Sequence, residues 1–230
     1  MMRLESTRLR LLAPLTDEQV AARVVEGDTG AFELLMRRHN QRLFRTARAV
    51  LSSESDAEDA LQDAYLRIYN GLADFESRSK LATWMTRIVF NESIRLRERR
   101  TRLRERERSG LTPGALDAGA ETREPVMSGA ERIRMFDEAM SDLSERERSV
   151  VMLRVIQGLS TRETAASLGM TESHVKVSLF RAKPKMSAAL EGAGVEEIRR
   201  ELSFDGERCD RVVAAVFDRL REPGGRARNP

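Results

Sequence analysis

Few side chains in this sequence have the type and spacing that catalysis or metal binding needs. His39 and His174 are the only histidines and lie far apart, and Cys209 is the only cysteine. Asp59 and Asp63 are four residues apart, so on a helix their carboxylates could share one metal ion. No third ligand and no nucleophile accompanies this pair, so a nuclease-like enzyme is a weak alternative. We expect no catalytic residue, no metal site and no cofactor.

Side chains suited to binding are concentrated in residues 144–183, SERERSVVMLRVIQGLSTRETAASLGMTESHVKVSLFRAK. Three hydroxyl residues there are potential helix N-caps, and two of them are followed three residues later by glutamate, as in a capping box. They are Ser144 with Glu147, Ser160 with Glu163, and Thr171. Gly169 can adopt the left-handed conformation that ends a helix. Two short helices joined by such a turn predict a helix-turn-helix, a DNA-binding motif.

The second helix of this motif is predicted to enter the DNA major groove. Polar residues near its start would face base edges: Glu172, Ser173, His174 and Lys176. Phosphate or backbone contacts are expected from Arg181 and Lys183 further along, and from Thr161 and Arg162 in the preceding helix. Each could instead be a solvated polar side chain, and Glu172 could simply favour the helix dipole. Pro184 predicts a kink or break near Lys183.

The composition indicates a helical protein. Of 230 residues, 33% are charged and only 5% aromatic, and no alternation of apolar residues predicts a strand. The net charge is only +3, but the arginines are segregated from the acids, which suits nucleic-acid binding. The N-terminus does not resemble a signal peptide, and no apolar run approaches the roughly 18 residues of a membrane helix. We expect an all-α, cytoplasmic protein with no membrane partner.

The chain is predicted to form two small helical domains joined by a flexible linker. A flexible arm at 1–15 precedes the first domain, 16–108. Residues 109–129 are rich in glycine, proline and small polar residues, which indicates the linker. The second domain, 130–191, contains the helix-turn-helix, and 192–230 is a C-terminal extension with short helices.

Apolar spacing predicts four helices in the first domain. They begin at Thr16, Ala31, Ser55 and Leu81. His39 falls on an apolar stripe, so we expect it to be packed in the core. Ser55 and Glu58 would form a capping box. The helix that follows has an acidic outer face, which could simply be a helix start favoured by the dipole.

Eight arginines and three glutamates lie between Arg95 and Arg108. This segment could be a solvated helix with i,i+4 ion pairs or a phosphate-binding surface. In the extension, apolar residues from Cys209 to Leu220 predict an amphipathic helix. Its apolar face must be buried on the second domain or on a partner, and Cys209 is expected to be packed there.

Two segments together resemble a known family. They are DAEDALQDAYLRIYNGLADFESRSKLATWMTRIVFNESIRLRER in the first domain and LSERERSVVMLRVIQGLSTRETAASLGMTESHVKVSLFRAK in the second. The combination of an acidic helix, a loop leading to Thr83-Trp84, a linker and a helix-turn-helix resembles the extracytoplasmic-function sigma factors of the sigma-70 family. The resemblance covers about residues 17–190.

The resemblance implies that the first domain binds the clamp helices of core RNA polymerase and opens the promoter −10 element. The second domain would bind the −35 element and the polymerase flap. The implied polymerase-binding residues are Asp56, Glu58, Asp59, Gln62 and Asp63. The implied −10 residues are Phe75, Ser77, Arg78, Ser79, Lys80, Asn91 and Arg95, with Trp84 expected in the core.

The resemblance also favours DNA or linker-channel contact for the arginine segment. It further implies that an anti-sigma protein could hold the chain inactive, and that all catalysis belongs to the polymerase. The alternative function is a one-component helix-turn-helix transcriptional regulator. That alternative accounts for the second domain, but not for the acidic helix, the Trp84 loop and the arginine segment together.

Overall fold

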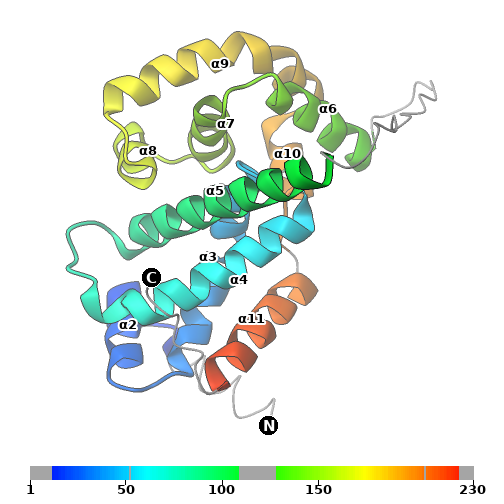
Figure 1. Ribbon diagram of the computed structural model, residues 1–230. Helices are drawn as coiled ribbons and strands as arrows, with labels where there is room; N and C mark the ends of the chain where they lie inside the picture. The colour runs from blue at the N-terminus through cyan, green and yellow to red at the C-terminus, as the bar shows by residue number, and fades with distance from the viewer. Residues whose placement is uncertain (1–11, 52, 109–127, 205, 223–230) are drawn as a thin grey trace.

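The computed structural model describes residues 12–51, 53–108, 128–204 and 206–222. All regular structure within these ranges is helical, as the sequence predicts (Figure 1). The first domain comprises α2 (Asp17–Val25), α3 (Ala31–Arg48), α4 (Glu54–Gly71), the short 3-10 turn η1 (Leu72–Asp74) and α5 (Leu81–Arg108). The predicted arm up to residue 11 and the predicted linker at 109–127 lie outside the described residues.

The second domain comprises α6 (Gly129–Ser141), α7 (Glu145–Val151), the π-helical segment η2 (Met152–Ile156), α8 (Thr161–Leu168) and α9 (Glu172–Ala193). The capping boxes predicted at Ser144 and Ser160 are both present. Thr171 caps α9 by accepting a hydrogen bond from the amide of His174 at 3.2 Å. Gly169 ends α8 with φ of 64° and ψ of 34°, the left-handed conformation predicted for it. The sequence therefore predicted the local geometry of the helix-turn-helix.

The start of α4 differs from the prediction. Ser53, not Ser55, is the N-cap, and its side chain accepts a hydrogen bond from the Asp56 amide at 3.2 Å. The predicted Ser55–Glu58 capping box is therefore wrong, because the helix begins two residues earlier. Glu58 lies instead 3.6 Å from the guanidinium of Arg211 in the C-terminal extension.

The first domain has one apolar core, in which Phe32 and Tyr65 are fully buried. Their rings meet edge to face with centroids 5.9 Å apart. His39 is buried, as predicted from its place on the apolar stripe of α3. Its Nε2 lies 2.8 Å from Asp17 Oδ2, so the pair joins the start of α2 to the middle of α3.

Pro184 does not break α9, which runs from Glu172 to Ala193 through it. Of the predicted kink or break near Lys183, the break is therefore wrong. Proline removes the amide that would bond to the Phe180 carbonyl, and both residues lie on the exposed side of the helix. The buried face of α9 is anchored on the opposite side by Ala182 and Met186, so packing keeps the helix intact.

The two domains pack against each other, with α8 beside α5 (Figure 1). Arg97 of α5 pairs with Glu145 at the start of α7, with 2.6 Å between Nη2 and Oε2. Gln157 Nε2 donates to Thr46 Oγ1 of α3 at 3.2 Å. These polar contacts join the first domain to the helix-turn-helix.

The C-terminal extension forms α10 (Val195–Glu201) and α11 (Gly206–Arg221), and it contacts both domains. Helix α10 packs on α6 and α9, whereas α11 lies along α3 and α4 (Figure 1). The apolar face of α11 is thus buried on the first domain, not on the second domain or a partner as predicted. An apolar stripe shows that a helix must be covered, but not which surface covers it. Cys209 is buried, as expected.

Candidate nucleic-acid and polymerase interfaces

The outer face of α9 is the most exposed part of the helix-turn-helix. Every residue predicted to contact the −35 element from α9 is exposed: Glu172, Ser173, His174, Lys176, Arg181 and Lys183. In α8, Arg162 is exposed and Thr161 is half-buried. Val175 is fully buried on the opposite side, together with Ala182 and Met186. The turn at Gly169 therefore presents one polar and basic side of α9 to the outside.

The centre of this face contains two apolar residues that were not predicted to bind DNA. Ser173, Val177 and Phe180 are spaced i, i+4 and i+7, so they form one stripe. The side of α9 bearing Phe180 is fully open, since this residue is 81% exposed, and Val177 is 47% exposed. Spacing could have revealed them, because the buried residues of α9 define the opposite side. Apolar side chains in a major groove can contact thymine methyl groups.

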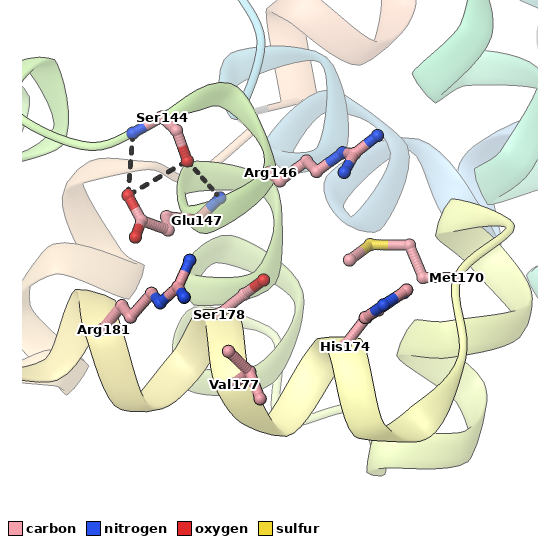
Figure 2. A pocket seen from close by; sticks show the side chains of 8 residues that line it. All are labelled: Ser144, Arg146, Glu147, Met170, His174, Val177, Ser178 and Arg181. Atoms are coloured by element: carbon pink, nitrogen blue, oxygen red, sulfur yellow. Dashed lines mark hydrogen bonds between the residues drawn. The ribbon is translucent and has the colours of Figure 1, made fainter.

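One edge of α9 borders an open hollow of about 530 Å³ (Figure 2). His174, Val177 and Arg181 line it from α9, and Arg146 lines it from α7. Figure 2 shows Ser144 and Glu147 hydrogen-bonded to each other at its side, so this glutamate is held in its capping role. The hollow thus carries two guanidinium groups beside the recognition face.

A second hollow of about 720 Å³ separates the start of α9 from α5. Its lining includes Phe90, Ile94 and Arg97 of α5, and Met170 and His174 of the helix-turn-helix. His174 therefore borders both hollows and faces the first domain as well as the predicted DNA side.

The loop before α5 contains most of the predicted −10 residues. Phe75 is half-buried because its ring packs on Trp84, with centroids 5.2 Å apart. Trp84 itself is partly buried against the core, close to the packed role expected for it. Ser77 has a positive φ of 55°, which marks a tight turn at the tip of the loop. The remaining predicted loop residues are exposed: Ser77, Arg78, Ser79 and Lys80.

Asn91 and Arg95 lie apart from this loop, further along α5. Both are exposed, and Arg95 pairs with Glu92 at 2.7 Å. Ten residues of helix separate Asn91 from Leu81, a distance of about 15 Å. The predicted −10 residues therefore form a path along α5 and not a single cluster.

The acidic face of α4 is paired with arginines from two other helices. Helix α5 supplies Arg100, whose Nη2 lies 2.9 Å from Asp56 and 3.8 Å from Asp59, and also Arg99, 3.6 Å from Asp63. Helix α11 supplies the remaining partners, Arg211 for Glu58 and Arg219 for Asp63. Gln62, which lies between Asp59 and Asp63 in the sequence, is half-buried. The predicted polymerase-binding residues thus share one side of α4, but most of their charge is already compensated.

The arginine segment of α5 consequently has a structural role within the described residues. Arg97, Arg99 and Arg100 make ion pairs with α7 and α4, and Arg102 pairs with Glu98 within the helix. The Arg102–Glu98 pair fits the interpretation of a helix with i,i+4 ion pairs, whereas the pairs with α7 and α4 were not predicted. Phosphate contact by this segment stays a prediction.

Glu163 has the most perturbed electrostatic environment in the helix-turn-helix. The hydrogen bond that it accepts from the Ser160 amide, together with the bond from Lys80, lowers its pKa to about 2. It is therefore ionised at neutral pH while it caps α8. Among the described residues, no group of three or more histidine, cysteine or acidic residues could hold a metal ion. Nor does any helix in the described ranges have the length and apolarity to span a membrane.

Comparison with known proteins matches both domains. Residues 35–103 match the model of Sigma-70 region 2, and residues 133–186 match that of Sigma-70, region 4. The ECF RNA polymerase sigma factor SigM of Mycobacterium tuberculosis is 31% identical over 178 residues, which cover 76% of this chain and 85% of SigM. RNA polymerase sigma factor CnrH of Cupriavidus metallidurans is 30% identical over 180 residues, 76% of this chain and 94% of CnrH.

Solved structures have a similar fold. CnrH in complex with the cytosolic domain of CnrY matches with a TM-score of 0.54 at 27% identity, over 76% of this chain and 97% of that one. The sigma factor RpoE of Bartonella quintana, in complex with the anti-sigma factor NepR, matches with a TM-score of 0.51 at 23% identity, over 65% of this chain and 90% of that one. Helices α10 and α11 lie beyond the end of the region 4 match.

Proposed function

The chain belongs to the extracytoplasmic-function sigma factors of the sigma-70 family, and from that premise we propose which of its surfaces bind DNA and polymerase. It is an RNA polymerase sigma factor and directs transcription initiation. A protein of this class regulates transcription and is not itself an enzyme. It acts in the cytoplasm, where RNA polymerase works, with residues 16–108 and 130–191 as its two functional domains.

The exposed side of α9 binds the −35 element in the major groove. The observation that carries this proposal is the continuous exposed stripe of Ser173, Val177 and Phe180, bordered by Lys176 and Arg181. Ser173 and Lys176 are placed to contact base edges, and the two apolar residues to contact thymine methyl groups. Arg181 lies at the edge of the stripe, where phosphate contact is favoured.

Further contacts with the −35 and −10 elements are assigned to the other predicted residues. Glu172, His174 and Lys183 flank the stripe, and Thr161 with Arg162 begin α8. In the first domain, the exposed loop residues from Ser77 to Lys80, with Asn91 and Arg95 on α5, form the path for the −10 element. Phe75, half-buried and packed on Trp84, lies at the start of that path.

The acidic face of α4 binds core polymerase, through Asp56, Glu58, Asp59, Gln62 and Asp63. The ion pairs that this face makes with arginines of α5 and α11 support a basic partner surface. Opposite charges on two partners increase the specificity and the rate of their association. A regulatory protein is a further partner of the two domains, as CnrH binds the cytosolic domain of CnrY.

Transcription with purified components tests this function. Core polymerase supplemented with the protein should initiate at a discrete set of promoters. The protein alone should not bind duplex promoter DNA tightly, whereas a one-component regulator would. Failure to copurify with core polymerase, or to direct initiation by it, would contradict the proposal.

A further inference from the structure

Helix α11 covers part of the first domain that would otherwise expose its core. Cys209, Val212, Val213 and Val216 are buried in the same apolar cluster as the residues of α3 and α4. The Cys209 thiol accepts a hydrogen bond from Asn40 Nδ2 at 2.9 Å. These contacts fix which side of α11 faces the domain and therefore which side chains reach its edges.

Arginines on α11 follow the acidic side of α4. Three pairs run in the same order along both helices. Arg208 pairs with Glu54 at 2.7 Å, Arg211 with Glu58 at 3.6 Å, and Arg219 with Asp63 at 2.8 Å. Two of these carboxylates, Glu58 and Asp63, belong to the proposed polymerase-binding face. A partner that needs those carboxylates therefore meets arginines of α11 already in place.

The segment before α11 is held by two side chains of α3, Gln41 and Arg45, and Arg45 Nε donates to the Leu202 carbonyl at 3.3 Å. Gln41 donates from Nε2 to the Leu202 carbonyl at 2.7 Å and accepts from the Phe204 amide at 2.8 Å. On the other side of this segment, α10 is tied to the second domain, where Arg199 Nη2 donates to the Val155 carbonyl at 3.0 Å. The extension thus links the helix-turn-helix domain to the acidic face.

We propose that this surface of α3 and α4 is a binding site for an arginine-bearing amphipathic helix, that α11 occupies it in the free chain, and that core polymerase must displace α11. The inference rests on the proposed polymerase-binding role of α4. Loss of the three ion pairs costs little, because each has one side chain that is 43–59% exposed and such pairs contribute little. Displacement also uncovers the buried apolar face of α11, so the displacing partner must cover the same surface of α3 and α4. A basic partner that binds the same carboxylates shifts the population toward a state with α11 released.

Hydrogen exchange on the full chain tests displacement without any substitution. Amides of residues 206–221 should exchange at least tenfold faster when core polymerase is bound, while those of α4 become more protected. Unchanged protection of 206–221 in the complex would overturn the proposal.

Charge reversal on α11 gives a second, independent test. R211E/R219E should weaken the docking of α11 and lower the Kd for core polymerase about fivefold at low salt. The matched control is R221E, on the same helix, because Arg221 pairs only with Asp218 of α11 itself in the contacts described. An unchanged or raised Kd for the double variant would overturn the proposal.

A third variant separates this inference from the proposed function. Asp59 is 54% exposed and pairs with Arg100 of α5, so D59K alters the acidic face at a carboxylate that makes no described ion pair with the extension. If this variant still binds core polymerase with the original Kd, the proposed face is wrong. If it binds at least tenfold more weakly while α11 stays protected in the wild-type complex, only the displacement proposal fails.

Discussion

Lys80 Nζ lies 3.0 Å from Glu163 Oε1, so the loop proposed to bind the −10 element contacts the first turn of the helix-turn-helix. The same glutamate caps α8 through Ser160. One carboxylate therefore serves the local fold of the second domain and its contact with the first. Lys80 can reach single-stranded DNA only if it leaves this pair.

Replacing Lys80 should separate promoter opening from stability. Its side chain is 76% exposed, and exposed ion pairs are worth about 0–1 kcal/mol. K80A should therefore change the free energy of unfolding by less than about 0.5 kcal/mol, yet slow promoter opening by polymerase several-fold. Urea unfolding and permanganate footprinting measure the two effects. K185A is the control, because Lys185 is also an exposed lysine paired with a helix-capping glutamate, Glu147, but lies outside the proposed −10 path. Equal opening rates for K80A and wild type would remove Lys80 from the proposed site.

The recognition stripe predicts different effects for a basic and an apolar residue. K176A should weaken promoter binding by the holoenzyme by roughly 1–3 kcal/mol if it contacts a base edge. F180A should cost about 1 kcal/mol, since a buried methyl or methylene contributes about that much. Because both side chains are exposed, neither change should alter the melting temperature measurably. V25A, an exposed apolar truncation on α2, is the control. Unaltered promoter choice in both variants would contradict the assignment of this face.

Pro184 predicts a stabilising substitution. An interior proline costs about 3 kcal/mol relative to alanine in a helix, and α9 continues through it on the solvent side. P184A should therefore raise the free energy of unfolding by about 1–3 kcal/mol, as measured by urea denaturation. A188P, one turn later on the same exposed side, should lower it. A destabilised P184A would mean that the proline matches a helix distortion that alanine does not.

The sequence predicted features that depend on neighbours within one helical turn. The capping boxes at Ser144 and Ser160 and the left-handed Gly169 follow from such spacing. The predicted start of α4 was wrong because Ser53 and Ser55 are both plausible N-caps. The packing of the rest of the helix selects between them.

Contacts between distant segments could not be predicted in the same way. Arg219 and Asp63 are 156 residues apart, and no periodicity indicates that they meet. The side of α11 to be buried was predictable from its apolar stripe, but the covering surface was not. The exposed Phe180 was overlooked because only polar residues were considered for DNA contact, although its register on α9 places it in the middle of the outer side.

Asp17 predicts a pH-dependent contribution to stability. The hydrogen bond from His39, aided by Arg38, lowers the pKa of this carboxyl from 3.8 to about 2. Because the folded pKa is below the unfolded one, ionised Asp17 stabilises the fold above about pH 4, and this contribution is lost as pH falls from about 4 to 2.

The matching variant is D17N. It should lower the free energy of unfolding by about 1–2 kcal/mol at pH 7, after allowance for partial exposure, and by much less at pH 2. Urea unfolding at both pH values measures this difference. The control is D218N, whose ion pair with Arg221 is exposed. A deficit of D17N that does not shrink with acidification would show that its effect is not electrostatic.

Gly169 connects the two helices of the DNA-binding motif, and its φ of 64° makes any side chain there unfavourable. A Cβ at this position would have Arg87 Nη2 as its nearest neighbour at 3.9 Å, so the cost arises from the backbone and not from a clash. G169A should lower the free energy of unfolding by about 1–2 kcal/mol, the usual penalty for a left-handed residue other than glycine. It should also weaken promoter binding, because the turn sets the direction of α9.

G192A is the matched control, since Gly192 lies within α9 without a positive φ and its Cβ would only touch Met135 at 3.5 Å. That control should stabilise the helix by about 0.5–1 kcal/mol. If both variants change stability in the same direction, the left-handed turn is not what glycine provides at position 169.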